Sequence, residues 1–280
     1  MKKYLAVFLL FQTISVAALV CEFGKIKDNT YSEELTYKKI ENDSLYKSYI
    51  LVDDNTGEIL IEDNKDSSYP IASLTKLMTA MVVLDNNFDL DRKIKVSSED
   101  ASIPYGVRIK AGKEYRIKDL LYYTLMMSSN SSANALASSV SKDFVSLMNK
   151  KAIELGLHNT SFCTANGLPP KYTNSCIDVS SAYDVYKMTK YALSNYPIIE
   201  EITSTKYKKV DGINLINSNE LLRKNDKIKG VKTGFHDIAG YNISIVYEDE
   251  EKNTRLYEVI LGSDSNEDRM LISETVLKNF

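Results

Sequence analysis

The sequence predicts an α+β fold in which both ends of the chain contribute strands to one antiparallel sheet, while the middle forms a lobe of helices. Short strand-like segments occur near residue 50 and again after about residue 205, and apolar residues recur at helical spacing between them. The 280 residues, 44% of them hydrophobic, can bury one sizeable core. We expect a domain over 48–280, with a helical lobe at about 73–204, a sheet lobe from 48–72 and 205–280, and a cleft between the lobes.

The first twenty residues have the features of a secretory signal. Lys2 and Lys3 precede an apolar stretch that ends in small residues. We expect residues 1–20 to be a signal peptide or a membrane anchor, and residues 21–47 to be a polar tether. In either case the domain is expected to lie outside the cytoplasm, either secreted or held on the outer face of the membrane.

The three cysteines leave two questions open. Cys21 follows the apolar stretch in an incomplete lipoprotein box, since Val20 stands where Gly, Ala or Ser is usual, so cleavage, anchoring and lipidation all remain possible. Outside the cytoplasm Cys163 and Cys176 can form a disulfide, although two free thiols fit the sequence equally.

The elements are expected in the following order. The hydrophobic pattern predicts a hairpin over 48–63 with its turn at 54–57, then a helix from 73 to 85 and short strands at 94–96, 107–109 and 115–117. A second helix is expected to begin at 118, and further helices are expected over 133–140, 143–155 and 180–196. The last part of the chain is expected to form strands at 206–210, 230–233, 239–247 and 256–261, followed by a closing helix over 264–280.

Charge and metal-ligand content exclude two classes of protein. The formal net charge is −3 and no long basic run reverses it, so nucleic acid is not an expected partner. Only His158 and His236 are present, without a Cys/His pair at metal-ligand spacing, so we expect neither a metal nor a cofactor.

Ser73-Leu74-Thr75-Lys76 places a nucleophile and a base within one helical turn. In a helix these two side chains lie on one face, and a lysine with a lowered pKa can take the proton of a serine. The same spacing also occurs at Ser44–Lys47, in the tether, and at Ser139–Lys142, at a helix end. Only Ser73 follows a hairpin and Pro70 and begins a long apolar helix.

Two further motifs can converge on this pair. Ser128-Ser129-Asn130 interrupts a helical segment, where a hydroxyl and an amide can face a cleft, although alone it would indicate a helix cap. Lys232-Thr233-Gly234 precedes a strand pattern, and Gly234 allows a substrate backbone to approach an edge strand.

The ordered set of three motifs resembles the D-alanyl-D-alanine carboxypeptidases, which are low-molecular-mass penicillin-binding proteins of serine peptidase family S11. The likeness runs from Ser48 to Phe280 and includes Asn166-Gly167-Leu168 and Ala239-Gly240-Tyr241-Asn242. It implies a β-lactamase/transpeptidase-like fold.

The resemblance also implies a mechanism. Ser73 would attack the carbonyl between the two terminal D-alanines of a peptidoglycan stem peptide, with Lys76 as its base. Ser128 would pass a proton to the leaving D-alanine. A β-lactam would leave a slowly hydrolysed adduct on Ser73.

The resemblance assigns the remaining roles to residues that hold the substrate. Lys232 would hold the local charge, and Asn130 the substrate amide. The backbone N–H groups of Ser73 and Phe235 would form the oxyanion hole. Thr233 and Arg269 would hold the terminal carboxylate.

Two departures from the family pattern stand out. His236 stands where relatives often carry Thr, either as a modulator of pKa values or as a tolerated loop substitution. The chain stops at Phe280, so we expect no C-terminal β domain, and any membrane attachment through the N-terminal segment alone.

Two other functions make different demands on the sequence. A serine β-lactamase on the same fold would need a glutamate that activates water, and Glu154 is instead expected at the end of a helix. A non-enzymatic wall-binding lipoprotein would be expected to have lost the motifs, yet all three are intact.

Overall fold

The structure is a computed structural model that describes residues 45–86 and 89–280. The predicted signal and most of the tether therefore lie outside the described residues. Residues 45–273 form one compact unit, and the description below concerns this unit; residues 274–280, which include the end of α12, are grouped outside it.

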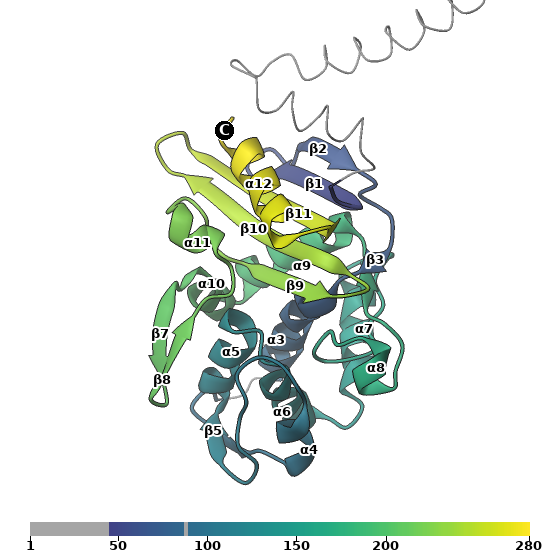
Figure 1. Ribbon diagram of the computed structural model, residues 1–280, viewed down its shortest axis with the longest axis vertical. Coiled ribbons are helices and arrows are strands. Elements are labelled where there is room, and N and C mark those ends of the chain that lie inside the picture. Colours follow the sequence, from purple (N-terminus) through teal and green to yellow (C-terminus); the bar gives the residue numbers. More distant parts are fainter. Residues whose placement is uncertain (1–44, 87–88) are drawn as a thin grey trace, which may run out of the picture. The chain divides into compact units, whose positions relative to one another are not determined.

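A five-stranded sheet in the order β2-β1-β11-β10-β9 is the frame of the molecule (Figure 1). The strand β1 is antiparallel to β11, with Ile50 opposite Val259. Both ends of the domain thus meet inside one sheet, which confirms the predicted fold class. The strands are β1 (Ser48–Asp53), β2 (Ile59–Asp63), β9 (Lys232–His236), β10 (Gly240–Asp249) and β11 (Thr254–Ser263).

Along the sequence, most of the helices lie between the strands β1 and β2 and the strands β9 to β11. In chain order they are η1 (Ala72–Leu74), α3 (Thr75–Asp85), α4 (Ser98–Ser102), α5 (Ile117–Met126), α6 (Asn130–Val140), α7 (Phe144–Glu154), α8 (Pro170–Thr173), α9 (Ala182–Asn195), α10 (Pro197–Ser204), α11 (Leu221–Lys224) and α12 (Asn266–Leu277). Figure 1 shows α9 behind the sheet and the beginning of α12 in front of it. Three two-stranded ribbons complete the fold: β3 (Tyr69–Pro70) with β6 (Val179–Ser180), β4 (Lys93–Lys95) with β5 (Glu114–Arg116), and β7 (Tyr207–Val210) with β8 (Ile213–Ile216).

The helix α3 is the centre of the helical lobe. Its residues from Thr75 to Val83 are all buried, so it is covered on every side rather than along one stripe. It contacts α5, α6, α7 and α9. This packing fixes the first turn of α3, and with it Lys76, rigidly inside the domain.

Several local predictions were wrong. Residues 107–109 form no strand, because the carbonyl of Val107 accepts hydrogen bonds from the side chains of Ser129 and Ser131 instead of a neighbouring strand. The short helix α4 was not predicted; Ser97 caps it by accepting from the backbone N–H of Asp100. The ribbon strand β8 and the helix α10 were also missed.

Cys163 and Cys176 are joined by a disulfide, with Cα atoms 5.4 Å apart. This settles the alternative that the sequence left open. The bond closes a loop that contains α8 and lies next to the site described below.

Candidate active site

Ser73 lies in the 3₁₀ turn η1, directly before α3, rather than in the α-helix itself. Ala72, which precedes it, has a positive φ of 48°, so the chain turns sharply into the helix. Lys76 follows in the first turn of α3 and is fully buried. Its Nζ lies 2.7 Å from Ser73 Oγ, so the structure brings together the predicted nucleophile and base.

Lys76 has two further partners. Its Nζ lies 2.7 Å from Asn130 Oδ1 and 2.5 Å from the carbonyl oxygen of Asn166. Burial, and then the nearby charge of Lys232, hold the pKa of Lys76 well below its usual range. Nζ can donate to the oxygens of Ser73, Asn130 and Asn166; when the amine is neutral, it can instead accept from the hydroxyl of Ser73. Lys76 and Ser73 thus lie within hydrogen-bond distance, as the prediction of a nucleophile and its base requires.

Ser128 and Lys232 form a second serine–lysine pair. Ser128 lies in the break between α5 and α6, at a positive φ of 55°. Lys232 begins β9, is 1% exposed, and places Nζ 3.1 Å from Ser128 Oγ and 2.7 Å from the carbonyl oxygen of Thr233. Burial, followed by the charge of Arg269, lowers the pKa of Lys232 to about 7.

Asn130 begins α6, and both the oxygen and the nitrogen of its side-chain amide form hydrogen bonds. Oδ1 accepts from Lys76, and Nδ2 donates to the carbonyl of Pro104 at 2.8 Å. One N–H of Nδ2 remains for a ligand.

The strand β9 is the edge of the sheet and lies against η1. A Cβ on Gly234 would come within 2.8 Å of the carbonyl oxygen of Ile71 and 3.1 Å of the nitrogen of Ser73, so only glycine allows this approach. Thr233 Oγ1 lies 3.0 Å from Ser218 Oγ. Phe235 stacks on Tyr241 at 4.2 Å and is half exposed.

Arg269 reaches this strand from α12. Its guanidinium donates to the carbonyl oxygens of Asn242 (2.8 Å) and Gly234 (3.4 Å), and to Oδ1 of Asn266 (2.7 Å). Burial lowers the pKa of Arg269 to about 10. Among the residues that the structure describes, no carboxylate forms an ion pair with it, so a buried positive charge remains available to an anionic ligand.

A cleft of about 450 Å³ joins these groups. Seven of the nine predicted site residues line it: Ser73, Ser128, Asn130, Thr233, Gly234, Phe235 and Arg269. The other two, Lys76 and Lys232, are buried behind the lining, and each contacts one of its serines.

The sequence did not indicate every residue of the site. Asn166 supports Lys76 through a backbone carbonyl, which any residue could supply, so no side-chain motif reveals it. Tyr105 and Tyr172 line the cleft with their hydroxyl oxygens 2.6 Å apart. Lys171 and Asp237, which also line the cleft, form an ion pair at 2.8 Å, so this ion pair and the tyrosine contact are two links between cleft-lining residues.

His236 also lines the cleft, with only 8% of its surface exposed. Its Nδ1 accepts from the backbone N–H of Ala239 at 3.0 Å, which places the proton of the neutral ring on Nε2. Burial lowers the pKa of His236. Its Nε2 is buried without a hydrogen-bond partner in the part of the chain that the structure describes, so no bond joins His236 to Lys76 or Lys232 there.

The β-lactamase alternative finds no support in this cleft. Glu154 is the last residue of α7, as predicted. Among residues 45–86 and 89–280, no glutamate lines the cleft. The group that a fast deacylating enzyme would use to activate water is therefore not seen here.

An antiparallel sheet from both chain ends, a helical lobe, and a Ser–Lys pair between them define the class of penicillin-binding serine enzymes. Comparison with known proteins agrees. A family model described as D-alanyl-D-alanine carboxypeptidase matches residues 36–265. The chain belongs to the D-alanyl-D-alanine carboxypeptidase family.

Individual relatives carry two different names. The chain is similar to a D-alanyl-D-alanine endopeptidase of Escherichia coli (strain K12), with 37% identity over 69% of this chain and 64% of the relative. It is also similar to the D-alanyl-D-alanine carboxypeptidase DacF of Bacillus subtilis (strain 168), with 31% identity over 80% of this chain and 59% of the relative. The chain thus spans about three fifths of the length of these two relatives.

A solved structure has the same fold. Penicillin-binding protein D2 of Listeria monocytogenes, in its cefotaxime-bound form, superposes with a TM-score of 0.75 and 30% identity, over 84% of this chain and 96% of that one.

Proposed function

We propose that this chain is a serine-type D-Ala-D-Ala carboxypeptidase that removes the terminal D-alanine from peptidoglycan stem pentapeptides. The observation that carries the proposal is the 2.7 Å contact between Ser73 Oγ and a buried Lys76 whose pKa is depressed. A neutral lysine in contact with a serine at the head of a cleft is the arrangement that covalent catalysis requires.

In the acylation step, neutral Lys76 takes the hydroxyl proton of Ser73. Oγ then attacks the carbonyl carbon between the two D-alanines. Backbone N–H groups of Ser73 and Phe235 receive the negative charge that develops on the carbonyl oxygen. The C–N bond breaks, the acyl group stays on Oγ, and the leaving amine gains a proton.

Ser128 is assigned to that last proton transfer. It lies between the cleft and Lys232, whose pKa of about 7 allows it to give and recover a proton near neutral pH. Water then attacks the ester, which regenerates Ser73 and releases the shortened peptide.

The substrate is held at its two ends. Arg269, a buried cation without an ion-pair partner among the described residues, and the hydroxyl of Thr233 are assigned to the terminal carboxylate. The free N–H of Asn130 is assigned to the amide on the acyl side. A β-lactam, which carries a strained amide and a carboxylate, would use the same contacts and acylate Ser73.

The site of action that we propose is the cell wall, outside the cytoplasm. Peptidoglycan lies there, and the disulfide between Cys163 and Cys176 is stable in such an environment. Membrane attachment through the N-terminal segment remains a prediction about residues outside the described ones. Among the described residues, no helix is long and apolar enough to cross a membrane.

The test begins with residues 45–280 and a penicillin. We expect one covalent adduct, mapped to Ser73 by peptide mass spectrometry, and release of one D-alanine from a pentapeptide that ends in D-Ala-D-Ala. An adduct on another residue would disprove the site. Turnover of penicillin within seconds would favour the β-lactamase alternative.

A D-alanyl-D-alanine endopeptidase is the second candidate, because the Escherichia coli relative bears that name. An endopeptidase cuts the peptide cross-link between two stems, so it must accept a leaving group larger than one D-alanine. Incubation with purified cross-linked muropeptide dimers separates the two activities. Release of D-alanine without monomer formation supports the carboxypeptidase, and monomer formation the endopeptidase.

A further inference from the structure

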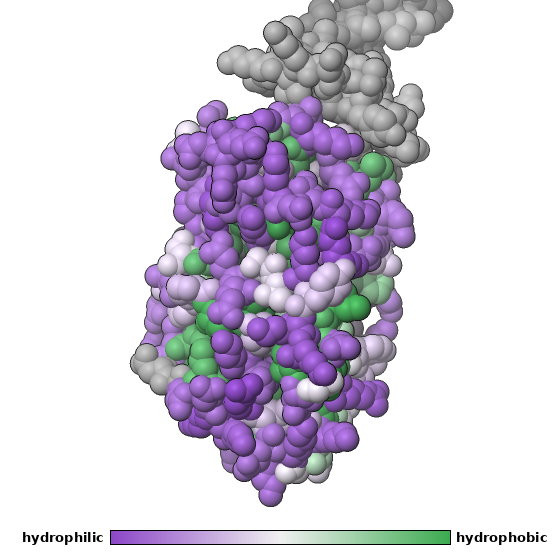
Figure 2. Space-filling model, turned by 90° about the vertical axis from the view of Figure 1, so that its left-hand side faces the viewer, coloured by the Kyte–Doolittle hydropathy of each residue, from purple (hydrophilic) through white to green (hydrophobic). Residues whose placement is uncertain are grey.

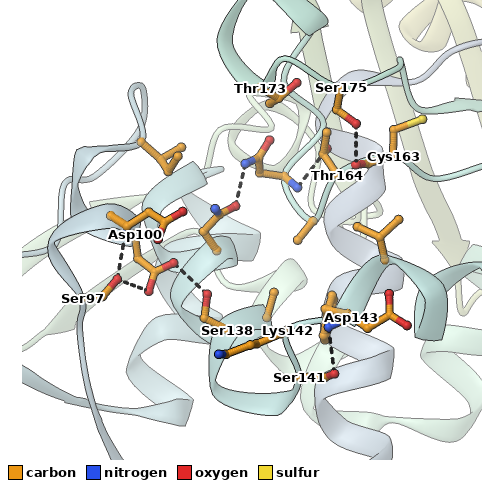
Figure 3. Close-up of a pocket in the computed structure, with 18 of the residues that line it drawn as sticks. Ser97, Asp100, Ser138, Ser141, Lys142, Asp143, Cys163, Thr164, Thr173 and Ser175 are labelled. Carbon is orange, nitrogen blue, oxygen red and sulfur yellow. Dashed lines mark hydrogen bonds between the residues drawn. The ribbon is translucent and has the colours of Figure 1, made fainter.

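A second hollow, of about 680 Å³, lies beside the cleft and has no part in the mechanism above. Its walls come from α4, from α6 and the beginning of α7, and from the loop that the Cys163–Cys176 disulfide closes. Figure 3 shows Ser97, Asp100 and Ser138 on one side of it, and Thr173 and Ser175 of the disulfide loop on another. It is larger than the catalytic cleft itself.

The hollow is connected to the cleft through Tyr172, which is linked through Tyr105 to Asn130. In the proposed complex the terminal carboxylate is at Arg269 and the acyl-side amide is at Asn130. The backbone N–H of Asn130 contacts the carbonyl of Tyr105, and the hydroxyl of Tyr105 contacts that of Tyr172. Tyr172 lines both the cleft and the second hollow. A substrate that continues past Asn130 therefore passes Tyr172 on its way towards the hollow.

Hydroxyl and amide groups make up nearly half of the lining residues. Seven of its nineteen residues carry a hydroxyl, and two carry a side-chain amide: Ser97, Ser138, Ser141, Thr164, Tyr172, Thr173, Ser175, Asn134 and Asn166. Asn134 Oδ1 accepts from Asn166 at 2.7 Å, and its amide NH₂ has no partner among the described residues. Thr173 Oγ1 is also buried without a partner there. The amide of Asn134 is therefore free to bond a polar ligand, whereas Thr173 Oγ1 exposes too little surface to reach one.

The charged side chains of the lining are one lysine and three carboxylates, so they disfavour an anionic ligand. Lys142 stands next to Asp143 in the chain, and Glu99 and Asp100 supply further carboxylates. Asp100 is 6% exposed and already accepts hydrogen bonds from Ser97 (2.7 Å) and Ser138 (2.9 Å). Mixed donors and acceptors at many positions suit a neutral ligand with several hydroxyls and an amide.

We propose that this hollow binds an N-acetylated amino sugar of the wall glycan, as a subsite for the sugar that carries the stem peptide. The inference rests on the proposed function, since it identifies what lies next to the cleaved peptide. Three residues separate the acyl D-alanine from the sugar, and in ordinary peptide linkage they span at most about 11 Å. The sugar therefore emerges close to the acyl end of the cleft, which Tyr105 and Tyr172 connect to the hollow.

The test compares two substrates in one set of variants. One is a short acylated tripeptide that ends in D-Ala-D-Ala, and the other is an N-acetylmuramyl pentapeptide. In the wild-type chain we expect kcat/KM to be higher for the muramyl substrate. Ser138→Trp, which fills the hollow, should lower the ratio of the two kcat/KM values at least fivefold, because only the longer substrate reaches this subsite.

Matched variants separate filling of the hollow from other effects. Ser139→Trp makes the same change one residue along α6, outside the lining, and should keep the wild-type ratio. Ser138→Ala removes only the hydrogen bond to Asp100. If Ser138→Trp does not fold, as judged by its thermal melt, it is replaced by Ser141→Trp, at the C-cap of α6 and also in the lining. An unchanged ratio in a folded Trp variant would overturn the proposal.

A binding measurement distinguishes failure of this inference from failure of the proposed function. N-acetylmuramyl dipeptide, which lacks D-alanine at its end, is titrated by calorimetry into the wild-type chain and into Ser138→Trp. We expect binding to the first that is lost in the second. Peptide cleavage without this binding disproves the sugar subsite alone, whereas binding without cleavage disproves the carboxypeptidase.

Discussion

Lys76 shows how burial sets the chemistry of one residue. A lysine on the surface is protonated at neutral pH, whereas this amine is fully buried and lies near a second lysine, and both effects disfavour its charge. Asn130 and Asn166 then fix the amine in the position at which it can accept a proton from Ser73.

Replacing Lys76 by Ala should slow acylation by a penicillin about 10²–10⁴-fold, because the base is lost while the nucleophile remains. Stopped-flow measurement of the adduct gives the rate. Lys150→Ala, at an exposed ion pair on α7, is the control and should acylate at the wild-type rate. Normal acylation in the Lys76 variant would exclude it as the base.

Removing the charge of Lys232 should shift the pH dependence of acylation. That charge lowers the pKa of Lys76, so the pKa of Lys76 should rise in Lys232→Gln. More of Lys76 is then protonated at a given pH, and the acidic limb of the acylation profile should move to higher pH. The midpoint of the limb is the readout, since the maximal rate also falls. A limb that moves to lower pH would contradict the electrostatic coupling.

Spacing and motif order predicted which residues meet in the cleft, because the roles expected of them belong to side chains, which a sequence motif records. They could not predict Asn166, which acts through its backbone carbonyl, or the bond between Ser218 and Thr233. Both contacts depend on how separate segments pack, and no local pattern records that.

The elements around Ser73 pack closely enough to require glycine. A Cβ on Gly167 would lie 2.1 Å from the carbonyl oxygen of Ala72, and its φ is +80°. Gly57 has a similar φ of +74° but nothing within 4 Å. The two positions therefore differ only in what surrounds them.

Gly167→Ala should destabilise the chain by about 1–3 kcal/mol more than Gly57→Ala, because overpacking adds to the same backbone strain. It should also slow acylation, since η1 must shift. Denaturant unfolding and penicillin acylation of both variants test this. Equal unfolding free energies would show that the loop yields without disturbing η1.

The disulfide ties the loop that separates the cleft from the second hollow. Replacing Cys163 and Cys176 by Ser should lower the free energy of unfolding by about 3 kcal/mol, because the 13-residue separation no longer restricts the unfolded chain. Thermal melts with and without a reductant provide the measurement. The reductant should lower the Tm of the wild-type chain and leave the double variant unchanged.

Element types were predicted well where periodicity was long, as in α3, α6, β10 and β11. The failures are short and context-dependent. At residues 107–109, where a strand was expected, the carbonyl of Val107 accepts hydrogen bonds from the side chains of Ser129 and Ser131 in place of a neighbouring strand. The helix α4 depends on one cap, at Ser97. In such segments a few tertiary bonds outweigh local propensity.

At the scale of the whole molecule, the sheet unites both ends of the domain, and one buried carboxyl lies at their junction. Glu258 in β11 is 0% exposed and accepts a hydrogen bond from Tyr49 in β1 at 2.6 Å. Burial raises the pKa of Glu258 to about 7.

The outer surface differs: hydrophilic residues cover most of the face in Figure 2, with hydrophobic ones in separate groups near its middle.

Glu258 should make the domain less stable as the pH rises. Its pKa is higher in the folded than in the unfolded chain, so its full contribution to stability is present below about pH 4.5 and is lost as the pH rises through about 7. Glu258→Gln should therefore stabilise the chain by up to about 3 kcal/mol at pH 8 relative to its effect at pH 4. Urea unfolding of both proteins at the two pH values tests this. An equal difference at both would contradict it.

The pairing of β1 with β11 also has a consequence for the order in which the chain is made. Ser48 lies opposite Leu261, so the first strand finds its neighbour only after more than two hundred further residues have been synthesised. Until then β1 has β2 as its one partner, and a lone hairpin is barely stable in water. A nascent chain that ends before β11 lacks the strand that joins β1 to β10. The sheet therefore stays in two separate pieces through almost the whole of translation, and the domain can close only when β11 has left the ribosome.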